Sequence, residues 1–175
     1  MALRSGFYYK DGIHRVDVDL PWKLGFDAYA KRQYIVDLHK LLGDKIPGCI
    51  ADVTTASFGE FRALSPVLRK IGTDSVDAVF GMMKDVYCTD QDHVLAETLY
   101  DLLYFKSFDD AARSTIDKID CFTDVFYNPS KYGAGTQALS LVRYKMLLAE
   151  GKLYLIEDAE QYYNWLREER ISVHV

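Results

Sequence analysis

The sequence has few cysteines, and their spacing fits no structural role. Cys49, Cys88 and Cys121 are an odd number, lie far apart and form no CxxC pair. Disulfide frameworks and thiolate metal sites both need cysteines that pair or cluster. We therefore expect reduced cysteines, buried as small apolar residues rather than used in catalysis.

Long apolar runs are also absent. No stretch approaches the roughly 18 consecutive apolar residues of a transmembrane helix. Charged residues such as Arg4, Lys10 and Asp11 interrupt the first twenty positions, where a secretory signal would need an apolar centre. We expect a cytoplasmic protein that does not associate with membranes.

The common catalytic and phosphate-binding motifs are missing as well. The chain contains no GxSxG, no HExxH and no GxxxxGK[ST] sequence. The glycines just before Thr136 resemble a phosphate-binding loop only in part, because no lysine precedes the threonine. The net charge of −5 lacks the basic excess of nucleic-acid-binding domains, so we expect no direct binding of DNA or RNA.

The composition is that of an ordinary folded domain. The 175 residues are 49% hydrophobic and 27% charged, with an aromatic content of 14% that includes 13 tyrosines. A chain of this length buries roughly 70% of its unfolded surface. We expect residues 1–175 to form a single domain.

Local patterns predict a mainly helical α+β fold with a small sheet. An Asp11-Gly12 turn between two alternating runs predicts an N-terminal hairpin from about residue 7 to 20. The apolar, β-branched run 49–55 predicts a buried strand. The apolar runs 153–156 and 171–175 predict C-terminal strands. The hairpin, 49–55 and the C-terminal strands would together form the sheet.

Helical periodicity and capping residues predict the helices outside the centre of the chain. A helix of about 27–42 ends at Gly43, which is a typical C-terminal stop. A helix of about 136–150 begins at Thr136, and Asp158 with Gln161 caps another of about 158–170. These helices would pack their apolar sides on the sheet.

The stretch 73–122 is a predicted block of three helices with an acidic excess. The second helix begins at Thr89 or Asp90, and the third at Ser107 with Asp110. The block contains eleven acidic and four basic residues. Most of these acids lie in first helical turns, where a negative charge stabilises a helix. We interpret 73–122 as a helical insertion, either a lid or part of the core.

Aromatic and arginine side chains near the C-terminus favour a binding function. On one helix, Tyr162, Tyr163 and Trp165 point in too many directions to face inward together. Tyrosine, tryptophan and arginine are enriched at the centres of protein interfaces, and Arg167 and Arg170 lie close by in the sequence. Our leading hypothesis is a non-enzymatic protein that binds another protein, as an inhibitor or adaptor.

The alternative is an enzyme. Five carboxylates lie at or just after the ends of predicted strands: Asp17, Asp19, Asp52, Glu157 and Asp158. If the strands were parallel, these ends would meet at one edge of the sheet, where α/β folds bind ligands. Asp17, Asp19 and Asp52 would then hold Mg²⁺ for phosphoryl transfer or nucleic-acid hydrolysis.

The enzyme hypothesis makes a geometric demand. The carboxyl groups must lie within about 4 to 6 Å of a common point to share one metal ion or two. In the simpler interpretation Asp158 only caps a helix, and Asp17 pairs with Arg15 or with a lysine of a helix.

Overall fold

The description rests on a computed structural model. It describes residues 2–21, 28–46, 48–53, 94, 97–98, 101–102, 104–106, 108–125 and 137–172. The first helix expected in the 73–122 block and the glycine-containing stretch before Thr136 lie outside the described residues. So does most of the second helix, although its described positions, from Val94 to Phe105, are helical as expected.

The N-terminal hairpin is confirmed and is longer than expected. β1 (Ala2–Tyr9) and β2 (Ile13–Leu20) pair antiparallel along their whole length, from Ala2 opposite Leu20 to Tyr9 opposite Ile13. Asp11 and Gly12 form the turn with φ angles of 51° and 128°. This left-handed conformation suits glycine and is tolerated by aspartate, which explains why this dipeptide marks the turn.

The sheet has four strands in the order β2-β1-β4-β3. β3 (Ile50–Asp52) is parallel to β4 (Cys121–Thr123), and β4 is antiparallel to β1. β4 therefore lies between strands that precede it by about seventy residues or more. The chain combines a mixed sheet with helices. The hairpin and a strand within 49–55 belong to the sheet as expected, but its fourth strand is β4, at the end of the expected helical block, and not a C-terminal strand.

The expected C-terminal strands are wrong. Residues Leu153–Glu157 form a 3-10 helix, η4, in which Leu155 and Ile156 are buried and Tyr154 is exposed. Ile171 and Ser172 are the end of a helix, and residues 173–175 lie outside the described part of the chain. A run of four apolar residues fits several local structures, and here a turn of helix buries two of them.

Side chains of successive residues along each strand point to opposite sides of the sheet, and each side has its own hydrophobic core. Val18 and Leu20 of β2 pack with Tyr34, Leu38 and other residues of α1 (Ala28–Gly43). Gly6 belongs to this side: a Cβ atom there would lie 2.9 Å from Leu42 Cδ1, so glycine lets α1 approach β1. We call this the α1 side of the sheet.

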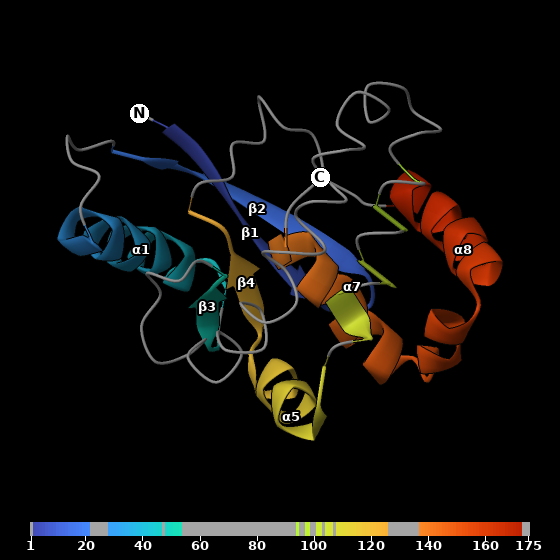
Figure 1. Ribbon diagram of the computed structural model, residues 1–175. Coiled ribbons are helices and arrows are strands. Elements are labelled where there is room, and N and C mark those ends of the chain that lie inside the picture. Colours follow the sequence, from blue (N-terminus) through green and yellow to red (C-terminus); the bar gives the residue numbers. More distant parts are fainter. Residues whose placement is uncertain are drawn as a thin grey trace.

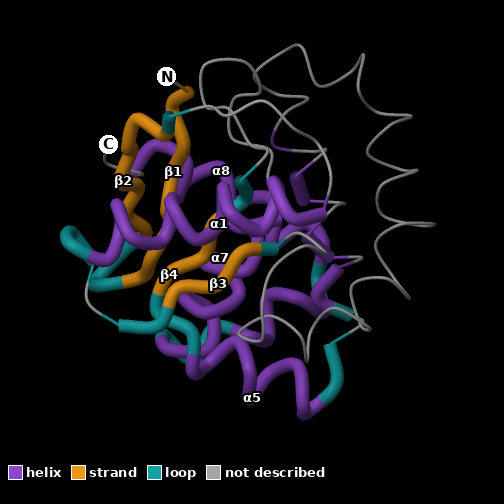
Figure 2. The backbone as a smooth tube through the Cα atoms, turned by 90° about the vertical axis from the view of Figure 1, so that its left-hand side faces the viewer, coloured by secondary structure: helices purple, strands orange, loops and turns teal. Residues whose placement is uncertain are grey.

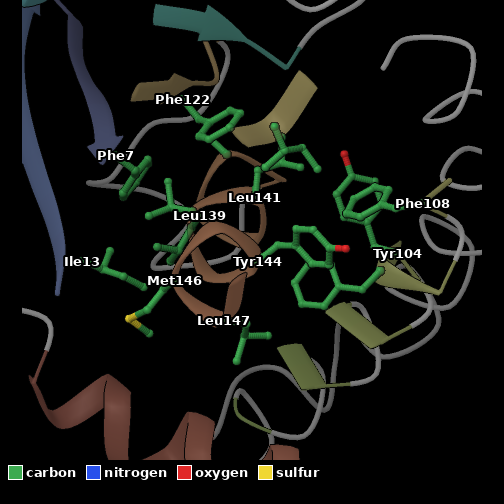
Figure 3. Close-up of a cluster of buried hydrophobic side chains, with 14 of the residues drawn as sticks. Phe7, Ile13, Tyr104, Phe108, Phe122, Leu139, Leu141, Tyr144, Met146 and Leu147 are labelled. Atoms are coloured by element: carbon green, nitrogen blue, oxygen red, sulfur yellow. The ribbon is translucent and has the colours of Figure 1, made fainter. Parts of the chain in front are cut away.

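The other side of the sheet carries the larger core, built around α7 (Gln137–Ala149). α7 lies against the strands (Figure 1), and Phe7, Ile13 and Phe122 of the sheet belong to its core. In Figure 3 these three side chains lie on one flank of α7, and Tyr104 and Phe108 lie on the opposite flank. The rings of Phe108 and Tyr144 lie 5.0 Å apart, nearly perpendicular. Because α7 is surrounded, most of its residues are buried, including Ser140 and Arg143.

Two further helices complete the α7 side. α5 (Asp110–Lys118) begins at Asp109, whose side chain accepts a hydrogen bond of 2.8 Å from the backbone N–H of Ala112. The expected start at Ser107 was therefore two residues early. α8 (Ala159–Ser172) packs through Tyr162, Trp165 and Leu166.

The described residues bear on two sequence-based expectations, the absence of a membrane-spanning helix and the absence of disulfides. None of the helices described is long and apolar enough to cross a membrane. Cys49 and Cys121 are not joined in a disulfide; the former is exposed and the latter is buried.

Candidate functional site

The register of the sheet separates the carboxylates that a magnesium site would need. Asp52 lies opposite Thr123, and Thr123 lies opposite Gly6. Asp17 lies opposite Ser5, one row further on, so its side chain points to the other side of the sheet. Asp17 and Asp52 are also three strand spacings apart, which is about 14 Å.

Asp17 and Asp158 each have separate local partners. Asp17 Oδ1 accepts a 2.6 Å hydrogen bond from the Ser5 hydroxyl and lies 3.2 Å from Arg15 Nε. Asp158 Oδ1 accepts from the N–H groups of Glu160 and Gln161, which makes Asp158 the cap of α8.

The two remaining carboxylates add nothing to a shared site. Asp19 and Glu157 point into solvent, from β2 and from η4. No group of three potential metal ligands occurs in the described part of the chain. The simpler interpretation, with Asp158 as a cap and Asp17 paired with Arg15, matches this geometry.

Asp52 instead belongs to a polar chain on the α1 side. It is fully buried, and its Oδ2 accepts from the Thr123 hydroxyl at 2.8 Å and from the Val125 N–H at 2.9 Å. Nε2 of His39, on α1, lies 3.0 Å from Thr123 Oγ1. A hydroxyl has one proton, and it is used toward Asp52, so His39 must donate through an Nε2–H. This series of hydrogen bonds links β3, β4 and α1.

A buried ion pair lies on the α7 side. Arg143 of α7 is 4% exposed, and its Nε and Nη2 donate to the two oxygens of Asp101 at 2.6 and 3.0 Å. The hydroxyls of Ser140 and Tyr162 also donate to Asp101, both at 2.6 Å. Asp101 itself is 0% exposed. We call these four residues the Asp101 cluster.

The Asp101 cluster shifts the pKa values of its members. Burial alone would lower the pKa of Arg143, but the charges of Asp101 and Glu97 outweigh burial and raise it. Burial, followed by the charge of Asp101, raises the pKa of Tyr162 well above its usual value. Arg143 therefore stays charged and Tyr162 stays neutral at any ordinary pH. The cluster has the properties of a structural clamp between helices, since its charges are matched and sealed from water.

The predicted binding residues divide between the core and the surface. Tyr162 is in the Asp101 cluster, and Trp165 is 9% exposed. Tyr163 is half-buried, Arg167 is exposed, and the side chain of Arg170 is outside the described part of the structure. On a helix, Tyr163 and Arg167 are four residues apart and share one face.

An exposed aromatic side chain that the sequence did not indicate lies where α7 meets η4. Tyr154 of η4 is 61% exposed, and Leu153 beside it is partly buried against the main core. Tyr9, Leu148 and Tyr163 are also partly buried against that core. We call these five residues the α7–η4 corner. The sequence suggested a four-residue apolar strand here, which did not indicate that Tyr154 would point outward.

Polar contacts fix the corner in place. Glu150, near the end of α7, accepts from the Tyr9 hydroxyl at 3.3 Å and pairs with Lys152 at 2.8 Å. These contacts join the hairpin tip to the turn after α7, and the same region lies at the lower right of Figure 1. The corner is thus made by β1, α7, η4 and α8.

The chain was compared with protein-family models, with curated proteins and with solved structures, and no match was found in any of the three. Its function must therefore be argued from its own residues.

Proposed function

We propose that the protein binds another protein, as an adaptor or inhibitor, and that the α7–η4 corner is the binding surface. The observation that carries this proposal is Tyr154, a large aromatic side chain that is 61% exposed in a corner whose other members are partly buried against the main core. Apolar side chains that remain exposed beyond what an ordinary monomer surface shows mark interaction sites.

The composition of the corner fits the proposal. Three of its five residues are tyrosines, and the exposed Arg167 lies one helical turn beyond Tyr163. Tyrosine and arginine are enriched among the residues that contribute most to binding. Glu150 and Lys152 supply both charge signs at the edge, as in the polar rim of an interface.

The corner is also well supported from below. Leu155 and Ile156 of η4 are buried, and Tyr9, Leu148, Leu153 and Tyr163 pack against the main core. A surface held in this way loses little conformational entropy when it binds, which favours affinity.

The separation of the predicted magnesium ligands removes the geometric support for the enzyme hypothesis.

The test is site-specific photo-crosslinking of the full chain in extract from its native host. A photoreactive phenylalanine at position 154 should give a discrete adduct, and excess wild-type protein should compete it away. Tyr154→Ala should lower the amount of partner that co-purifies by about tenfold or more, as expected for a central interface tyrosine.

Tyr29 provides the matched control, because it is 78% exposed but lies on α1. Tyr29→Ala should leave co-purification unchanged. If Tyr29→Ala removes the partner and Tyr154→Ala does not, the corner is not the binding surface. If neither position yields a competed adduct, the proposal fails.

A further inference from the structure

β2 and β3 are the two edge strands of the sheet, and β2, with eight residues, is the longer edge. Figure 2 shows β2 beside β1 at the margin of the sheet. All eight residues of β2 pair with β1, and among the described residues no strand pairs with its other edge. The outward N–H and C=O groups of such an edge can pair with another strand.

The side chains of β2 alternate in a way that makes the edge self-complementary. Arg15, Asp17 and Asp19 point to the α7 side, while Val16 and Val18 point to the α1 side. If a second copy of β2 lies antiparallel with Val16 opposite Val16, then Arg15 of each copy lies opposite Asp17 of the other. Opposite charges that face each other across strands stabilise their pairing.

Other registers that keep the sides of the sheet matched are less favourable. Centring the pair on Asp17 places Arg15 opposite Asp19 but brings Asp17 against itself, and centring it on Arg15 brings two guanidinium groups together. Centring it on His14 places Arg15 opposite Ile13 and forms no pair of opposite charges. Centring it on Val18 places Asp17 against Asp19. Since like charges directly opposite destabilise strand pairing, the charge pattern selects the register centred on Val16.

Arg15 and Asp17 have the capacity for these additional contacts. Their side chains are 27% and 24% exposed. Ser5 and Arg15 both engage Oδ1 of Asp17, and among the described residues no partner engages its Oδ2. Oδ2 can therefore accept from the guanidinium of a second copy without loss of the contacts within the chain.

We propose that two copies of the chain associate through β2, antiparallel and centred on Val16, so that the two four-stranded sheets become one continuous sheet. Two Arg15–Asp17 pairs flank the centre of this interface. The association uses the hairpin edge and does not depend on the α7–η4 corner.

The test is analytical ultracentrifugation of the wild type and of charge-reversal variants over a range of concentrations. The wild type should show a monomer–dimer equilibrium. Arg15→Asp and Asp17→Arg should each raise the dimer dissociation constant by about tenfold or more, because like charges then face each other at both pairs. An equimolar mixture of the two variants should dimerise again, since one chain is acidic and the other basic at these positions.

A control variant tests whether the effect is specific to β2. Arg113 forms a similar exposed pair with Asp110 on α5, and Arg113→Asp should leave the dissociation constant unchanged. Circular dichroism checks that each variant is folded. Hydrogen exchange of the wild type gives a second test without substitution, because β2 amides should become more protected as concentration rises.

The proposal is overturned if the wild type stays monomeric at all concentrations and its β2 amides exchange at a constant rate. It is also overturned if both single variants dimerise like the wild type, or if folded variants fail to associate when mixed. Dimerisation that Arg113→Asp abolishes would place the interface on α5 instead.

Discussion

Among the described residues, each side of the sheet buries one aspartate completely, and the two are stabilised differently. On the α7 side, Asp101 faces the guanidinium of Arg143 and accepts from two hydroxyls. On the α1 side, Asp52 accepts from the Thr123 hydroxyl and from a backbone N–H, with the half-buried His39 beyond.

The difference shows two ways to place polar groups in a core. A buried ion pair is costly to form and still more costly to break, because removal of one partner leaves a charge without compensation. The loss of one hydrogen bond from an uncharged donor lowers the free energy of unfolding less than the loss of one partner of a buried ion pair. We therefore expect the α7 side to be the more sensitive of the two, and four predictions follow this order.

The largest effect is expected from loss of the cation in the Asp101 cluster. Arg143→Met keeps much of the side-chain volume but leaves Asp101 buried without its counter-charge, so the free energy of unfolding should fall by about 3 to 5 kcal/mol. Urea denaturation measures this change. Arg113→Met removes an exposed arginine paired with Asp110 and should cost less than about 1 kcal/mol. Equal losses in the two variants would refute the assignment of Arg143 as a clamp.

A smaller loss, with a pH signature, is expected at Tyr162. Tyr162→Phe removes one hydrogen bond to a charged group and should cost about 1.5 to 3 kcal/mol near neutral pH. Burial and Asp101 raise the pKa of Tyr162, so its stabilisation is complete below the usual tyrosine pKa of about 10 and is lost as the pH rises beyond it. The variant should therefore lose stability less steeply above about pH 10.

Urea midpoints of the wild type and the variant across the alkaline range make this comparison. Tyr154→Phe is the control for the loss of a tyrosine hydroxyl, because Tyr154 is 61% exposed and outside the Asp101 cluster, and its stability near neutral pH should match that of the wild type. A variant profile parallel to that of the wild type would show that Tyr162 ionises normally in the folded state.

On the α1 side we expect moderate losses that depend on an oxygen atom rather than a charge. Asp52→Ala leaves the Val125 N–H and the Thr123 hydroxyl without their acceptor and should cost about 1 to 3 kcal/mol. Both groups donate to the same oxygen, so Asp52→Asn can keep these two bonds with its carbonyl oxygen and should cost less than Asp52→Ala. If the two variants are equally destabilised, the charge of Asp52 matters more than its geometry.

The smallest effect concerns cysteine chemistry. Burial raises the pKa of Cys121 on the α1 side to about 12, whereas Cys49 is exposed. Only the thiolate reacts rapidly with alkylating agents. Iodoacetamide near pH 8 should modify Cys49 and leave Cys121 intact in the folded protein, without a change in stability. Peptide mapping by mass spectrometry resolves the two sites, and modification in urea provides the positive control. Rapid alkylation of Cys121 in the native state would show that this core opens easily.

The sequence predicted those elements whose signals are local. The Asp11-Gly12 turn, the Gly43 stop and the Asp158 cap each depend on neighbouring residues, and each appears where it was expected. β4 gave no such signal, because its three residues form a strand only when β1 and β3 are beside them. The apolar run 153–156 was mispredicted for a different reason, because its length fits a strand and a turn of helix equally well.

The candidate sites depended on information that is not local. The magnesium hypothesis assumed parallel strands, whereas β2 is antiparallel to β1 and lies three strands away from β3. The register of the sheet also points Asp17 and Asp52 to opposite sides. Asp101 and Arg143 are 42 positions apart and could not be paired from the sequence. One usable signal was present: Ser140 and Arg143 interrupt the apolar side of a helix, which indicates a buried polar partner.

The place of β4 within the sheet has a consequence for how the chain folds during synthesis. The hairpin, α1 and β3 leave the ribosome well before Cys121–Thr123, yet the sheet cannot close until β4 enters between β1 and β3. Until then β1 and β3 each expose an unpaired edge. Such long-range pairing slows folding and leaves open strands available for aggregation. A chain truncated before residue 121 should therefore keep the sequence of the β1–β2 hairpin and its Asp11-Gly12 turn, and still fail to form a stable sheet.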